Sequence, residues 1–395
     1  MKERPLVPLV ILVSCTHALV HLFELSIPSI ELDLAQTYGV DRATTGLLSF
    51  TWRFPFGIGA FFAGWLVDHF GPRRLLSIYL FGCCATGLAV LLPLPLAALF
   101  VVMFLMGSAA SIYHPAGLSL LSFETTHETR ARALGLHGIF GSAGIGGAPF
   151  LAGAVLALGG SWKLLYLLLA GLAALLGTLF LAQTRGRLVH ARGDTSSRPD
   201  TAEQRATHWR AYAVLITIGT LQGFTYSAVL TFLRRFLAQM DWLQGTWSGS
   251  DAAVTGAVLL VGCLGQFLAG AWARHRWLER QLLAVIACTI PGLVWMSVAR
   301  GVTQLISAAL FVLFYFAHQP LYNTLVAKYT PPHRRSLAYG ISFGMGLGVG
   351  GAGAAFAGRM PTLAGAYLAL GGVVTIAACL ALLLCFLTRK DVRAD

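Results

Sequence analysis

Glu24 lies deep inside a long apolar stretch that runs from about residue 6 to residue 30. His17 and His21 precede it with helical spacing, so at 100° per residue the three side chains share one helix face. An ionisable group within such a segment is costly and marks a functional site by default. The spacing predicts a face that binds a proton or contacts a ligand, and the alternative is a purely structural ion pair.

Arg53, in the next apolar stretch, is the most available partner for Glu24. At 1.5 Å per residue, Glu24 lies about 9 Å from the expected end of its helix at Ile30, and Arg53 about 12 Å from the expected start at Thr45. A buried charge without a partner costs several kcal/mol. We therefore expect a pair in which Glu24 carries a proton once Arg53 moves away, with Arg53 as the gatekeeper.

The same residues have a spacing that could hold a metal ion. His17 and His21 lie one turn apart, and Glu24 could serve as a third ligand. Such histidine pairs are far commoner than metal sites, and the sequence contains no second ligand cluster. We expect neither a metal ion nor a cofactor.

Further polar residues interrupt other apolar stretches. They face either a central cavity, where they would contact a ligand, or neighbouring helices, to which they would hydrogen-bond. We expect the cavity to be lined by His17, His21, Tyr113, His114, His137, Gln222, Tyr226, His318, Gln319, Tyr322 and Asn323.

The composition identifies the elements that must position these residues. Of 395 residues, 56% are hydrophobic and 11% are charged, and the mean hydropathy of +0.72 excludes a soluble fold. We expect an all-α polytopic membrane protein with twelve spans of about twenty residues. Their approximate ranges are 6–30, 45–67, 75–92, 96–121, 133–158, 163–183, 210–238, 251–273, 281–298, 302–327, 337–360 and 363–387.

The basic residues predict the orientation of the chain. If the N-terminus is inside, 21 of the 28 Lys and Arg residues lie in inner segments and four in outer ones. Because basic residues accumulate in cytoplasmic loops, both termini should be cytoplasmic. The same rule accounts for the net charge of +12 without a nucleic-acid partner.

The two halves of the chain repeat. We expect residues 1–183 to form one six-helix bundle, 184–209 a cytoplasmic linker and 210–395 a second bundle. A constant offset of 205 aligns Pro115 with Pro320 and Gly141 with Gly346, and it also aligns Arg130 with Arg335, Ala133 with Ala338, Gly135 with Gly340, Gly146 with Gly351 and Gly153 with Gly358. Parallel six-helix repeats are an architecture of alternating-access transporters.

The segment Gly64-Trp-Leu-Val-Asp68-His-Phe-Gly71-Pro-Arg73-Arg74 resembles the signature of the major facilitator superfamily, although His69 replaces its usual arginine. Tyr113-His114-Pro115-Ala116-Gly117 and the His-bearing first span are similar to the fosmidomycin-resistance branch. The resemblance implies the major facilitator fold in a bacterial inner membrane. It implies a monomeric, proton-driven antiporter that exports a small drug-like molecule or metabolite.

Within that signature, a carboxylate at the inner end of the second span can pair with Arg or with helix N-terminal amides. We expect Gly64, Asp68, Gly71, Arg73 and Arg74 to form a conformational latch for the outward-open state, or a turn that only sets topology. Two other functions stay open: transport of a metal chelate or siderophore through a His-lined cavity, and a membrane-embedded enzyme or receptor. No assembled catalytic motif favours an enzyme.

Overall fold

The computed structural model describes residues 6–125, 127–185, 208–331 and 334–388, and within these residues all regular structure is helical. The described residues up to 185 form one helical bundle, and those from 208 onward form a second. The N-terminal bundle consists of α1 (Leu6–Glu24), α2 (Ser26–Tyr38), α3 (Arg42–Phe70), α4 (Pro72–Ala89), α5 (Leu96–Ala110), α6 (Tyr113–Glu124), α7 (His127–Ala157) and α8 (Trp162–Thr184).

The C-terminal bundle begins with α9 (Trp209–Leu237), which starts 24 residues after Arg185, the last described residue that follows α8. The expected linker therefore falls largely outside the described residues. The other elements are η1 (Asp241–Leu243), α10 (Ser250–Trp272), η2 (His275–Trp277), α11 (Leu278–Val298), α12 (Val302–Tyr329), α13 (Arg335–Phe343), the π-helix η4 (Gly344–Val349), α14 (Ala352–Arg359) and α15 (Leu363–Leu387).

In the described residues these elements make twelve passes, because α1–α2, α5–α6 and α13–η4–α14 are each one interrupted helix. Ten passes are long and apolar enough to cross a membrane. The other two passes are α3 and α4. Arg53 lowers the mean hydropathy of α3, and Arg73 and Arg74 lie in the first turn of α4. The chain is a multi-pass membrane protein with the predicted twelve-helix fold.

Proline explains two of the interruptions. Pro28 and Pro115 have no N–H to donate to the carbonyl four residues earlier, which belongs to Glu24 and Ser111 respectively. The first helix of each pair ends at or next to the residue whose carbonyl loses its donor, at Glu24 and Ala110. At the first break the chain continues in the same direction, since the Leu25 N–H still donates to the His21 carbonyl at 2.9 Å. The break therefore places Glu24 at a helix end within the bundle.

The first pass is longer than the sequence predicted. The helix does not end near residue 30 but continues to Tyr38, and the next begins at Arg42 rather than residue 45. Glu31 and Asp33 thus lie within α2 instead of at the edge of a span, and Glu31 is fully buried. The first pass ends later and the second begins earlier than expected. Glu24 and Arg53 therefore both lie farther from the connection between the two passes, and their depths remain similar.

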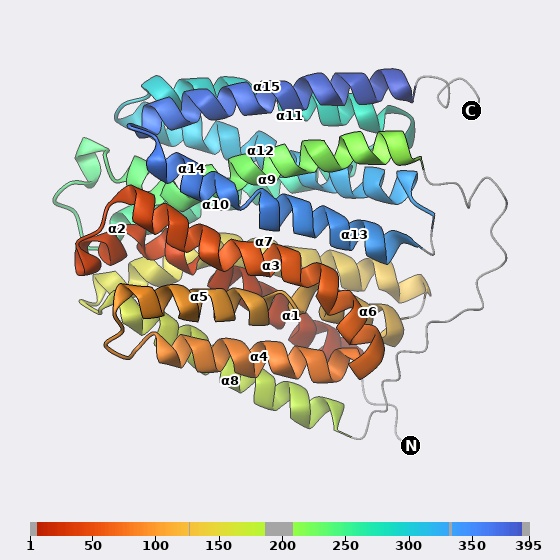
Figure 1. Cartoon of the computed structure of the whole chain (residues 1–395), viewed down its shortest axis with the longest axis horizontal. Helices are drawn as coiled ribbons and strands as arrows, with labels where there is room; N and C mark the ends of the chain where they lie inside the picture. The colour runs from red at the N-terminus through yellow and green to blue at the C-terminus, as the bar shows by residue number, and fades with distance from the viewer. Residues whose placement is uncertain (1–5, 126, 186–207, 332–333, 389–395) are drawn as a thin grey trace.

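Each bundle has its own hydrophobic core. One cluster of buried residues comes from positions 9–180, and the other from positions 211–384 with Leu25, Ile145 and Ala148. Between the bundles, α3 packs against α13, η4 and α14, and α7 packs against α10. The end of α8, the start of α9 and the end of α15 lie at one end of the molecule, opposite the α2–α3 and α14–α15 connections (Figure 1).

Candidate functional site

Glu24 and Arg53 form a buried ion pair between α1 and α3. Arg53 Nη1 donates to Glu24 Oε1 at 2.6 Å, and each side chain is 1% exposed. Because two charges removed from water need each other's compensation, losing either partner would leave a buried charge. The pair therefore ties the last residue of α1 to the middle of α3.

Two histidines extend this pair into a chain of hydrogen bonds. His21 Nδ1 lies 2.7 Å from Glu24 Oε2, and His21 Nε2 lies 3.2 Å from His17 Nε2. His17 Nδ1 in turn lies 2.7 Å from the carbonyl oxygen of His137 on α7. The three residues of α1 thus share one face, as their spacing predicted.

The donors and acceptors along this chain depend on the histidine tautomers. Its three contacts, Glu24–His21, His21–His17 and His17–carbonyl, each need one hydrogen to be a hydrogen bond. Two neutral imidazoles have one N–H each, and an ionised carboxylate has none. All three contacts can therefore be hydrogen bonds at once only when the chain carries one proton more than two neutral imidazoles supply.

Aromatic residues surround the histidines. The His17 ring stacks on His137 with centroids 3.9 Å apart and on Tyr113 at 5.3 Å. Tyr113 donates to the Val13 carbonyl at 2.8 Å, and its oxygen lies 2.9 Å from His137 Nε2. The rings of His17 and Tyr113 therefore each contact the rings of both His114 and His137.

His114 connects the cluster to the other bundle. Its ring lies 5.6 Å from His21 and stacks on Phe343 at the end of α13, with centroids 5.1 Å apart. Nitrogens of His17, His21 and His114 lie within 4.8 Å of one another, which is the spacing of a set that could hold a metal ion. Glu24 is not part of this set, since it is committed to Arg53 and His21.

The C-terminal bundle presents tyrosines to Arg53. Its guanidinium carbon lies 5.1 Å from the centroid of the Tyr226 ring, within the range of a cation–π contact. Tyr226 stacks on Tyr315 at 5.7 Å, and Tyr315 donates to the Gln222 carbonyl at 2.8 Å. His318 contacts the Tyr315 ring at 4.8 Å. Three expected cavity residues, Gln222, Tyr226 and His318, thus gather next to the ion pair around Tyr315.

Of the remaining cavity candidates, Tyr322 lies next to His318, with ring centroids 6.4 Å apart, whereas Gln319 is exposed. Tyr322 pairs with Ser342 at 2.9 Å, and the Asn323 side chain is exposed. Gln319 accepts from Gln266, whose own oxygen accepts from Ser142 of α7. This polar contact between the bundles does not include the histidines.

The expected latch residues surround the α3–α4 connection. Gly71 adopts φ +80°, a conformation that favours glycine, and directly precedes α4. Asp68 is exposed and, in the described part of the chain, has no ion-pair or hydrogen-bond partner, Arg73 and Arg74 included. Gly64 has no neighbouring atom within 4 Å of an added Cβ. The latch stays a prediction.

At the opposite end, charged residues that sequence reasoning did not single out join the bundles. Arg235 of α9 holds Glu31 of α2 through Nε at 2.8 Å and Nη2 at 2.9 Å. Arg234 pairs with Asp33 of α2 and with Asp251 of α10. The adjacent arginines at the end of an apolar stretch were the available signal. We call this the closed end.

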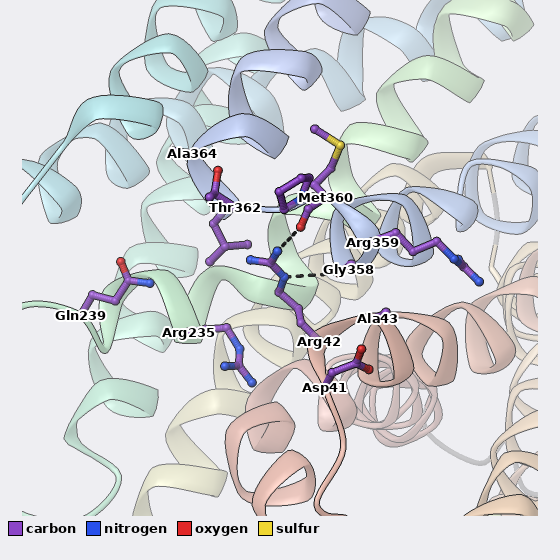
Figure 2. Close-up of a pocket in the computed structure, with 12 residues that line it drawn as sticks. Asp41, Arg42, Ala43, Arg235, Gln239, Gly358, Arg359, Met360, Thr362 and Ala364 are labelled. Atoms are coloured by element: carbon purple, nitrogen blue, oxygen red, sulfur yellow. Dashed lines mark hydrogen bonds between the residues drawn. The ribbon is translucent and has the colours of Figure 1, made fainter.

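A pocket of about 720 Å³ opens at the closed end. Figure 2 shows Arg42 at its centre, with the guanidinium directed to the carbonyls of Gly358 and Met360. Arg42 belongs to α3 and the two carbonyls to the α14 region, so these contacts also join the bundles. Contacts between the two bundles therefore line this pocket.

Known proteins resemble this chain in sequence and in fold. The family described as Major Facilitator Superfamily matches residues 13–355. Among curated proteins, none matches this sequence.

Solved structures of transporters share the fold at low identity. A bacterial homolog to the human lysosomal transporter Spinster, inward-facing and occupied, is 15% identical, with 99% of each chain covered and a TM-score of 0.74. The peptide transporter POT in complex with sulfate is 15% identical, covering 97% of this chain and 94% of that one, with a TM-score of 0.77. A point mutant of the nucleoside transporter NupG is 14% identical, with coverage of 97% and 99% and a TM-score of 0.73.

Proposed function

Because this chain belongs to the Major Facilitator Superfamily, whose structural neighbours here are transporters rather than enzymes, we propose that it is a proton-coupled antiporter. It exports a small drug-like molecule or metabolite across a bacterial inner membrane. The observation that carries the proposal is the chain Arg53–Glu24–His21–His17, which joins two helices and can accommodate one proton beyond those of two neutral histidines.

Alternating access supplies the transport step. The closed end is held by ion pairs between α2 and α9, whereas Asp68 at the other end of α3 has no partner in the described residues. With the predicted orientation, the closed end faces outward and the latch residues face the cytoplasm. Rocking of the bundles would break the outer pairs and engage the latch.

Proton coupling follows from a movement between α1 and α3. While Arg53 holds Glu24, the carboxylate is stabilised as an ion. If α1 and α3 also move apart within the N-terminal bundle as the bundles rock, the isolated carboxylate takes up a proton, and the His21–His17 contacts provide an adjoining path. Substrate export and proton import would then use opposite phases of one cycle.

Proteoliposome flux tests the proposal. Purified protein is reconstituted with a compound found by screening an expressing strain against toxic compounds, and flux is measured with and without an imposed pH gradient. We expect uphill movement only with the gradient, together with proton movement reported by an enclosed pH dye. Identical flux under both conditions would refute proton coupling, and no flux of any toxic compound to which expression confers resistance would refute transport.

A further inference from the structure

Two arginines from different bundles share the pocket at the closed end. Arg42 is the first residue of α3, Arg235 lies in the last turn of α9, and both line the cavity of about 720 Å³. Figure 2 shows both guanidinium groups at this pocket, whereas a third arginine, Arg359, extends away from them. Among the described residues that line the cavity, Asp41 is the only acidic one. The pocket therefore carries more positive than negative charge.

The charge of Arg42 has no carboxylate partner within the residues that the structure describes. Its Nε and Nη2 donate instead to the carbonyls of Gly358 and Met360. Of the charged groups around Arg42, Arg235 has the strongest electrostatic effect on it, and that effect is repulsive. Both side chains are partly buried, so water screens this repulsion less than it would at an open surface. An anion between the two arginines would relieve it.

The pocket also contains hydrogen-bond donors that are not in use. Arg235 holds Glu31 through Nε and Nη2, and Arg42 uses the same two nitrogens for carbonyls. Nη1 of each arginine thus has no partner in the described part of the chain. Beside Arg42, the buried hydroxyl of Tyr367 is likewise unpartnered among the described residues. A buried donor without a partner is costly, so these groups favour a ligand that accepts hydrogen bonds.

We propose that this pocket binds a phosphate group between Arg42 and Arg235, and that the bound anion stabilises the closed end as a regulator rather than as cargo. Guanidinium groups form strong, charge-assisted hydrogen bonds with phosphate oxygens. A tetrahedral oxyanion carries oxygens on every side, so it can accept from two walls of the pocket at once. Because the walls belong to different bundles, such an anion binds only while the bundles are together. Binding is independent of the proposed transport function, whereas regulation of turnover rests on it.

Inorganic phosphate and the headgroup of an anionic phospholipid offer the same chemistry, and thermal unfolding separates them. The full chain is placed in nanodiscs of phosphatidylcholine, and its melting temperature is measured against inorganic phosphate at constant ionic strength. We expect a saturable rise if the free anion is the ligand. If the lipid is the ligand, phosphatidylglycerol in the nanodisc should raise the melting temperature, and added phosphate should have no further effect. No rise in either arm would overturn the proposal.

Arg42→Gln tests whether the effect comes from this pocket. Phosphate stabilises many proteins weakly by exclusion from their surfaces, and such a rise would persist in every variant. We expect Arg42→Gln to abolish the saturable rise and Arg300→Gln, at an exposed arginine between α11 and α12, to keep it. An equal rise in the Arg42→Gln protein would show a general salt effect and overturn the site.

Asp41→Asn provides a variant with the opposite expected effect, because Arg42→Gln also removes contacts to two carbonyls. Asp41 caps α3 by accepting from the Thr44 N–H at 2.9 Å, and asparagine caps helices equally well. Removing its negative charge should tighten phosphate binding by about twofold or more. A damaged fold would not produce such a gain. Unchanged or weaker binding by the Asp41→Asn protein would contradict an anion held next to Arg42.

Flux measurements separate regulation from transport itself. In proteoliposomes, the ligand identified by melting should slow gradient-driven flux of the wild-type protein and leave flux of the Arg42→Gln protein unaffected. Equal flux of the wild-type protein with and without the ligand would overturn its regulatory role. Absence of any flux would instead refute the proposed function, while the melting temperatures still decide whether the pocket binds phosphate.

Discussion

Arg235 binds Glu31 side-on across the interface of the two bundles. Its Nε and Nη2 donate to the two carboxylate oxygens at 2.8 and 2.9 Å. Glu31 also accepts from Thr45 of α3 at 2.6 Å, so a single carboxylate connects α2, α3 and α9. Any opening of this end must break that arrangement. Removing either residue of the pair should therefore change the equilibrium between the closed and open states of this end.

We predict that Arg235→Ala shifts the protein toward opening of the closed end. Losing about 1–2 kcal/mol from the closed state would raise the open population about five- to thirtyfold. The measurement is maleimide labelling of a cysteine placed at Gln239, in the pocket of that end. Arg300→Ala removes an exposed arginine that has no ion pair in the described residues, and should leave labelling unchanged. Equal labelling of all three proteins would argue against a closure held by this pair.

Glu24→Gln should abolish flux driven by a pH gradient while leaving substrate exchange at equal pH largely intact. The amide keeps the shape of the side chain but cannot exchange a proton in this range. Arg53→Ala should impair both activities, because it leaves the Glu24 charge buried alone at a cost of about 3–5 kcal/mol. Flux is measured in proteoliposomes with matched protein content. Normal uphill accumulation by the Glu24→Gln protein would return this residue to a structural role.

For the latch, we expect Asp68→Asn to lower turnover more than substrate binding. Neutralising an exposed carboxylate far from the buried cluster should change the relative stability of conformations rather than the site itself. Turnover and equilibrium binding are measured on the same preparation, with His69→Gln as a neighbouring control. Lost binding with unchanged turnover per bound substrate would rule out the latch.

The histidine cluster makes a separate prediction about metals. Replacing His17 and His21 together by Ala should leave cellular zinc, iron and nickel contents and tolerances unchanged. The three imidazoles bring no negative charge to the site, and Glu24, the nearest carboxylate, is already paired with Arg53. Elemental analysis of expressing and control cells makes the comparison. A clear change in any of these metals would favour transport of a metal or its chelate.

Topology is tested by reporter fusions. We predict that a reporter active only in the cytoplasm works when fused after Asp395 or within residues 187–205, because the basic residues are concentrated on that side of the predicted topology. The ends of α8 and α15 lie at the same end of the molecule, as this requires (Figure 1). A fusion at either place that is active only in the periplasm would reverse the orientation.

The sequence by itself determined the helices and the depth of the charges within them. Hydropathy and helical rise are local properties, so they placed twelve passes and brought Glu24 and Arg53 to similar depths, and the 3.6-residue period aligned His17, His21 and Glu24. The end of the first pass was wrong by eight residues, because Glu31 and Asp33 looked like a polar boundary.

Only the tertiary structure decided which groups meet. Glu31 is buried inside a helix because Arg235, distant in sequence, neutralises it there, and hydropathy does not register such a partner. The carbonyl that fixes His17 belongs to α7, and the tyrosine beneath Arg53 belongs to the other bundle. These contacts depend on how rigid helices rotate and dock, a property of the packed bundles that no single segment contains.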